Sequence, residues 1–149
     1  MTGIERRSGF VLLLVLAIVS LPDWLRAMEI REFDKMSAED RQAYMNFLSE
    51  AAQKVLLEAG RKDDAAKVYK LFNEVNPGNV LSDGEIAFEG NLDRLRVADV
   101  KKHAENPDAR RLEVEDALFV TLKKGGVVLP PSFYDAGKNF KPKHPLQNH

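Results

Sequence analysis

Asp99 and His103 have the residue types and the spacing of a catalytic pair. They lie four residues apart, and on an α-helix this spacing brings two side chains onto the same face. A carboxylate beside an imidazole can orient a general base or supply part of a metal site. Because nothing in the sequence points to a serine nucleophile or a third ligand near them, we interpret the two residues as a solvated ion pair.

Three carboxylates, Glu113, Glu115 and Asp116, form a second candidate cluster. Glu113 and Asp116 share a helix face, as the paired carboxylates of a glycosidase would need to do. All three fall in the first turn of an expected helix, where negative charge complements the helix dipole, and we favour that role. The sequence contains no Gly-rich phosphate loop, G-x-S-x-G elbow or H-E-x-x-H motif. No catalytic residue is therefore assigned.

The segment Asp83-Gly84-Glu85-Ile86-Ala87-Phe88-Glu89 resembles the second half of an EF-hand calcium loop, in which an apolar residue follows a glycine turn. The resemblance implies calcium as a ligand. With Gly84 at the sixth loop position, Leu81 and Gly90 occupy positions that need oxygen ligands. We favour a polar turn in which Ser82 caps a helix. Asp83, Asp99 and His103 are the candidate metal ligands, and no cofactor is expected.

Aromatic residues are spaced along a C-terminal arm that is rich in proline and lysine. Apolar anchors on such a segment bind a protein partner at a low ordering cost. The pattern predicts a partner-binding site made of Phe133, Tyr134, Phe140 and Lys141. The competing interpretation is that residues 130–140 wrap the helices and complete the protein's own core.

Four helices must position these residues. The first begins after Ser37 and ends near Ala59, before Gly60. One half of its helical wheel is apolar, which predicts a buried stripe of Tyr44, Phe47, Leu48, Ala51, Ala52, Val55, Leu56 and Ala59. The second is capped by Asp63 or Asp64, runs to about Val75, and should pack against the first as an antiparallel hairpin.

The third helix, from Ser82 to about Ala104, carries two apolar stripes, one of Phe88, Leu92 and Leu95 and the other of Ile86, Val97 and Val100. Such a helix is either covered on two sides or bends near Gly90. The fourth, about 112–124, is apolar almost all the way round and belongs in the centre of the bundle or in a partner's groove.

The expected fold is a small all-α, four-helix domain over residues 28–137. Residues 28–36 should form an extended lead-in that places Phe33 on the core. Residues 138–149 form a basic tail with proline and histidine, which we expect to be flexible.

An apolar run from Phe10 to Leu21 precedes the domain. Arg6 and Arg7 stand before it, Pro22 and Asp23 break it, and Ala27 offers a small residue for cleavage. This layout predicts a secretory signal peptide over residues 1–27. The run is shorter than the roughly 20 residues that span a membrane. An uncleaved membrane anchor and a true start at Met28 are the alternatives.

The composition of residues 28–149 is that of one ordinary domain. The chain has no cysteine, and residues 28–149 retain 19 Lys+Arg and 21 Asp+Glu, which gives no electrostatic case for nucleic acid. An export signal followed by a small helical domain resembles several classes of bacterial envelope protein, among them secretion-system immunity proteins and periplasmic acid-stress chaperones. We therefore expect an exported protein, periplasmic or secreted, that binds another protein, with a ligand or metal carrier of the envelope as the alternative and a small hydrolase as the third choice.

Overall fold

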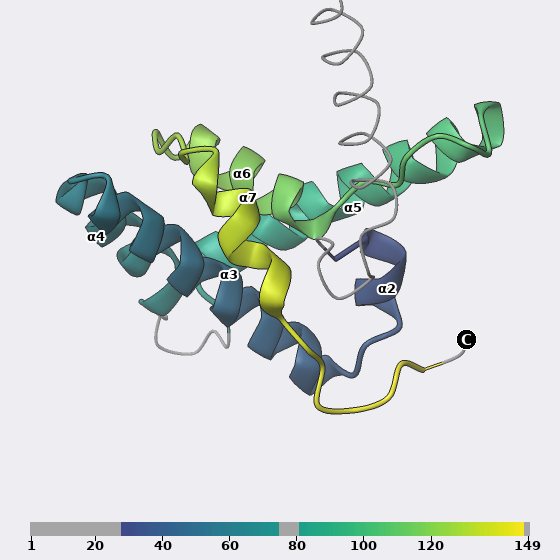
Figure 1. Cartoon of the computed structure of the whole chain (residues 1–149), viewed down its shortest axis with the longest axis horizontal. Helices are drawn as coiled ribbons and strands as arrows, with labels where there is room; N and C mark the ends of the chain where they lie inside the picture. Colours follow the sequence, from purple (N-terminus) through teal and green to yellow (C-terminus); the bar gives the residue numbers. More distant parts are fainter. Residues whose placement is uncertain (1–27, 75–80, 148–149) are drawn as a thin grey trace, which may run out of the picture.

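The computed structural model describes residues 28–74 and 81–147. Within these ranges the chain forms six α-helices, one short 3₁₀ helix and no β-strand (Figure 1). The all-α prediction is therefore confirmed, whereas the number of helices differs from the expected four. The helices are α2 (Ile30–Asp34), α3 (Ala38–Glu58), α4 (Lys62–Asn73), α5 (Asp83–Glu105), α6 (Val114–Lys124), α7 (Ser132–Ala136) and the 3₁₀ helix η2 (Gly137–Asn139).

Helix α3 supplies the largest share of the core. The Ser37 hydroxyl accepts a hydrogen bond from the Asp40 backbone N–H and caps the helix. Gly60, with a positive φ of 75°, follows its C-terminal end and allows the turn into α4. Most of the predicted stripe is buried, namely Tyr44, Leu48, Ala51, Ala52, Val55 and Leu56.

Helix α4 packs against α3, as the short turn at Gly60 predicts (Figure 1). The expected side-chain cap by Asp63 or Asp64 is wrong, because α4 begins after Arg61 without one. Asp64 instead accepts hydrogen bonds from the Arg61 guanidinium, which also donates to the Val128 carbonyl at 2.6 Å. This arginine ties the α3–α4 turn to the segment that follows α6.

Helix α5 begins with a capping box. The Glu85 N–H donates to the Ser82 hydroxyl at 3.2 Å, and the Ser82 N–H donates to the Glu85 carboxylate at 2.6 Å. The helix continues without interruption past Gly90. The apolar stripe of Phe88 and Leu92 is buried against the rest of the protein.

The first described residues pair with the start of α6. The Val114 N–H donates to the Met28 carbonyl at 2.9 Å, and the Ile30 N–H donates to the Leu112 carbonyl at 3.1 Å. The expected extended lead-in thus includes a short helix, α2, which places Phe33 in the core as predicted. Helix α6 packs on α5 and buries Val114, Ala117, Leu118 and Leu122, whereas Phe119 and Val120 are only partly buried.

No helix of the described residues has the length and apolar character needed to cross a membrane. The predicted signal peptide, residues 1–27, lies outside the part of the chain that the structure describes.

Candidate functional site: an exposed face of helix α5

One face of α5 carries apolar side chains that nothing in the described structure covers. Val97 is 71% exposed, Val100 is 68% exposed and Ile86 is 51% exposed. Gly90, Asp93 and Ala104 are also exposed, and their helical spacing places them on the same face. The alternative in which this second stripe is covered is therefore wrong, and α5 continues as one helix through Gly90.

The opposite side of α5 explains why this face is free. Its N-terminal half packs on α4 and α6, where the Asn91 amide donates to the Thr121 hydroxyl at 2.9 Å. Its C-terminal half extends beyond the other helices (Figure 1). An ion pair between Arg96 and Asp34 of α2, at 2.7 Å, attaches this extension to α2.

Two cations stand beside the exposed valines. Arg94 and Lys101 are both exposed, seven residues or two helical turns apart. Within the described residues, no carboxylate forms an ion pair with either of them, whereas the neighbouring Arg96 pairs with Asp34 and Asp93. The C-terminal half of this face thus combines an apolar strip with an unpaired positive edge. We call Arg94, Val97, Val100, Lys101 and Ala104 the α5 face.

The pair Asp99–His103 lies away from the α5 face. The structure does bring the two residues together, with His103 Nε2 3.6 Å from Asp99 Oδ1. Their side chains are almost completely buried, so the expectation of a solvated ion pair is wrong. The reason is that the 106–113 segment folds back over them, and the His103 Nδ1–H donates to the Pro107 carbonyl.

Asp99 fastens this segment to α5. Its carboxylate accepts hydrogen bonds from the Leu112 N–H at 2.9 Å and from the Arg111 guanidinium at 3.0 Å. Burial opposes the negative charge, but these two donors hold the pKa of Asp99 below its ordinary value. The Asp99 carboxylate thus connects α5 to the segment that precedes α6, and this structural role accounts for its burial.

Asp83 occupies the opposite end of α5 and does not approach Asp99 or His103. The capping box occupies the place of the resembled calcium loop, and Gly84 lies inside the helix. A Cβ atom on Gly84 would lie 2.5 Å from the Leu71 carbonyl oxygen, so close contact with α4 explains the glycine. Among the described residues, no three His, Asp or Glu side chains come together in a way that could hold a metal ion.

A cavity of about 300 Å³ lies beside Asp83, between α4, α5 and the end of α6. Its lining is mixed in charge and partly apolar: Lys67, Lys70, Leu71, Glu74, Asp83, Leu122, Gly125 and Val127. This volume is at the lower limit of pockets that bind small molecules.

The three acidic residues at the start of α6 lie in two different environments, one at the helix N-terminus and one in the protein interior. Glu113 and Asp116 form a reciprocal cap at the helix N-terminus, as the dipole interpretation predicts. Glu115 is completely buried, and neither carboxyl oxygen has a hydrogen-bond partner in the described structure. Glu115 lies in the first turn as predicted, but its burial does not suit the expected role of a negative charge that complements the helix dipole. The sequence did contain a signal, because Leu112, Leu118 and Phe119 lie three or four residues away on the same face.

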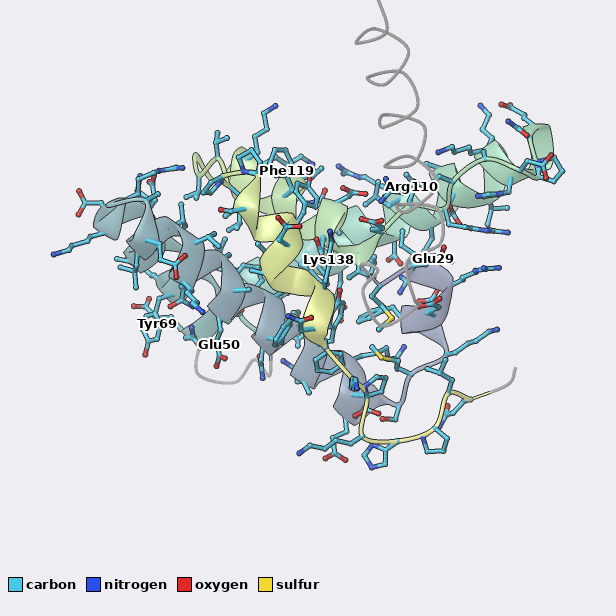
Figure 2. All side chains as sticks on the ribbon, in the orientation of Figure 1. Glu29, Glu50, Tyr69, Arg110, Phe119 and Lys138 are labelled. Carbon is cyan, nitrogen blue, oxygen red and sulfur yellow. The ribbon has the colours of Figure 1, made fainter. Side chains whose placement is uncertain are left out.

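The surroundings of Glu115 favour its neutral form. Burial raises its pKa to about 8, and the negative charges of Glu113 and Asp116 act in the same direction. Lys138, labelled in Figure 2 on the segment that covers this region, opposes the shift. Tyr44 is buried in the same interior, where burial and the charge of Glu115 raise the pKa of its hydroxyl.

The C-terminal arm packs on the helices. Phe133 is 0% exposed and belongs to the core, so it is not available to a partner while the arm is docked. Phe140 is half-buried, with its ring centroid 4.8 Å from that of Tyr44 on α3. Tyr134 is half-buried near Phe119, at 6.3 Å between ring centroids, and Lys141 is exposed. These positions fit the interpretation in which the arm completes the core.

The tail beyond the arm is fastened to the first turn of α3. The buried carboxylate of Asp40 accepts hydrogen bonds from the Lys143 N–H at 3.1 Å and from the His144 N–H at 2.9 Å. Burial opposes the charge of Asp40, but these donors and the His144 ring lower its pKa below the ordinary value. The structure thus gives the residues expected to be a flexible tail a defined attachment point.

These features define a small helical protein whose interior is closed by its own C-terminal arm and whose α5 face is uncovered. No family model matches the chain, and comparison with curated proteins and with solved structures finds no significant similarity.

Proposed function

We propose that the protein is an exported helical protein that acts by binding another protein through the α5 face. The observation that carries this proposal is the exposure of Val97 and Val100, at 71% and 68%, on the half of α5 that extends beyond the other helices. Contiguous apolar residues on a projecting helix are typical of a docking surface, whereas scattered ones are ordinary. The buried aromatic arm is a weaker candidate because Phe133 is inaccessible.

The α5 face is tested by comparing two variants with the same change in chemistry. Val97→Asp/Val100→Asp places charge on the face, and Leu57→Asp/Tyr69→Asp does so at two other exposed apolar residues. We expect a specific host envelope protein to be retained by the wild type and by the Leu57/Tyr69 variant, and to be lost by the Val97/Val100 variant. Thermal unfolding confirms first that both variants fold. Equal retention by all three proteins would contradict the proposal.

Export is tested by the intact mass of the protein recovered from its host. The layout of Phe10 to Leu21 and Ala27 leads us to expect a chain that begins at Met28 and is found outside the cytoplasm. A full-length chain in the membrane fraction would instead make residues 10–21 an anchor. A chain beginning at Met28 in the cytosol would remove the argument for export.

A second candidate function is the carriage of a small ligand, which the cavity beside Asp83 favours. Stabilisation by a ligand that binds only the folded state follows from mass action. A thermal-shift screen with calcium, zinc and a metabolite panel tests it, with Lys70→Ala/Asp83→Ala as the matched variant. If none of these ligands raises the melting temperature of the wild type, this candidate is rejected.

A further inference from the structure

We propose that the partner segment bound by the α5 face is an amphipathic helix with acidic residues along its edges. This inference rests on the proposed function and specifies the chemistry of the partner. It follows from the arrangement of the apolar and charged side chains on the face.

The apolar positions have the spacing of a helix–helix seam. Val97, Val100 and Ala104 are separated by three and four residues, the alternation of the a and d positions of a heptad. Asp93, Gly90 and Ile86 continue the same pattern towards the start of α5. Valine and alanine are small, so a partner backbone can approach closely. A helix is therefore the element that fits this face best.

The positive charges of Arg94 and Lys101 favour a partner helix that carries negative charges. In this heptad register, Arg94 and Lys101 each follow a d position and so occupy the e positions that face the edge of a neighbouring helix. Both are exposed, and neither has an ion-pair partner among the described residues. Carboxylates at the corresponding positions of a partner would complete both pairs.

The same charges disfavour a second copy of this chain. In an antiparallel pair, e positions face e positions, so Arg94 would meet Arg94 or Lys101 of the other copy. In a parallel pair, Lys101 would approach Arg96 of the other copy and Asp93 would face Asp93, and the one attractive contact would be that of Glu89 with Arg94. Both orientations place like charges together.

An anionic membrane surface is also a poorer match than an acidic helix. The face lacks the bulky apolar or aromatic residues with which interfacial helices insert into lipid.

Two designed peptides test the inference on the full chain. Each has about 21 residues in three heptads, with leucine at a and d. One carries glutamate at e and g, and the other carries lysine there. We expect fluorescence anisotropy to show that the wild type binds the acidic peptide at least about tenfold more tightly than the basic one. The preference should reverse in Arg94→Glu/Lys101→Glu. It should persist in Lys54→Glu/Lys70→Glu, which reverses two exposed lysines on α3 and α4.

Several outcomes would overturn the inference. Equal binding of both peptides, or binding of neither, would show that the charges do not select a partner helix. Binding to vesicles of equal parts phosphatidylserine and phosphatidylcholine, without binding to the acidic peptide, would favour a membrane. A sedimentation profile of a dimer that Val100→Asp dissociates would identify a second copy as the occupant. If a host protein is captured through Val97 and Val100 but is insensitive to Arg94→Glu/Lys101→Glu, the proposed function stands and this inference fails.

Discussion

Gly137 lies directly against the carboxyl group of Glu115, so that a Cβ atom at residue 137 would overlap Oε1 and Cδ of that side chain. Glu115 is completely buried, so its carboxyl group would have to shift within the interior to admit a methyl group at residue 137. The absence of a side chain at Gly137 therefore allows η2 to seal the interior above a buried acid.

Gly137→Ala is expected to destabilise the protein by about 1–3 kcal/mol, the usual cost of overpacking a closed interior. The effect should be much smaller in a Glu115→Ala background, which removes the atoms that the new methyl group meets. Urea unfolding of the four proteins of this cycle measures the coupling. Gly125→Ala is the control, since its Cβ would make only ordinary contacts at 3.4 Å and beyond. Additive effects of the two changes would contradict the proposed contact.

Glu115 makes the free energy of unfolding depend on pH. The folded protein keeps the proton to about pH 8, whereas the unfolded chain releases it near the ordinary value of 4.5. Between these values the folded state binds more protons, so stability is highest below 4.5 and falls as the pH rises. The slope is at most about 1.4 kcal/mol per pH unit for one proton.

Glu115→Gln should remove this part of the pH dependence, because the amide cannot lose a proton. We expect the variant to gain stability relative to the wild type between pH 6 and roughly pH 8. The control is Glu50→Gln, at an exposed glutamate of α3 that Figure 2 labels. Parallel stability curves for wild type and Glu115→Gln would show that Glu115 is ionised in the folded protein.

Asp99→Ala is expected to cost about 2–3 kcal/mol, because it removes an acceptor shared by the Leu112 N–H and the Arg111 guanidinium. Asp99→Asn keeps one acceptor oxygen and should cost less. The pKa of Asp99 is lowered, so its contribution is present above pH 3.8 and is lost as the pH falls further. Asp93→Ala, on the exposed side of α5, should change stability by less than about 0.5 kcal/mol. Equal losses for the Asp93 and Asp99 variants would be inconsistent with this role.

Asp40→Asn should release the tail from α3, because an amide nitrogen cannot accept the hydrogen bonds that one of the carboxylate oxygens receives from His144. Trypsin should then cut after Lys143 several times faster than in the wild type, and mass spectrometry identifies the product. Glu39→Gln, at the exposed carboxylate 3.9 Å from His144, serves as the matched control. Unchanged cleavage in Asp40→Asn would mean that these hydrogen bonds do not hold the tail.

Phe133→Ala separates the two interpretations of the arm. If the arm is part of the core, the variant should lose about 3–5 kcal/mol of stability, whereas Lys141→Ala should change it by less than about 0.5 kcal/mol. Denaturant unfolding gives both values. A Phe133→Ala protein with wild-type stability and impaired partner binding would instead support the predicted partner site.

Local patterns in the sequence predict the helices well. The caps at Ser37 and Ser82, the turn at Gly60 and the apolar stripe of α3 depend on residues close in the chain, and the structure contains them. The sequence does not predict features that depend on how one element packs on another. The cover over Asp99 and His103 comes from residues 106–113, and the exposure of Val97 depends on which helices do not reach it.

The sequence predicts the candidate site only in part, because the exposure of its residues depends on how the elements pack. Periodicity identifies Val97 and Val100 as a second stripe, but it cannot say whether another helix covers that stripe. Glu115 has the sequence context of a dipole-stabilising acid, and its apolar neighbours on the same helix face do not reveal that Gly137 of η2 packs against its carboxyl group. Phe133 and Phe140 have the appearance of partner anchors until their contacts with α3 are known.

The attachment of both ends of the described chain has a consequence for the order of folding. Met28 pairs with Val114, and Asp40 holds backbone groups 103 and 104 residues later. Contacts of such long sequence separation form late, since closing a large loop costs conformational entropy. During synthesis, α3 can pair with α4 early, whereas the first attachment must wait until Val114 has left the ribosome and the second until Lys143 and His144 have done so. We therefore expect a nascent chain truncated before Lys143 to lack the native protection of its first turn of α3.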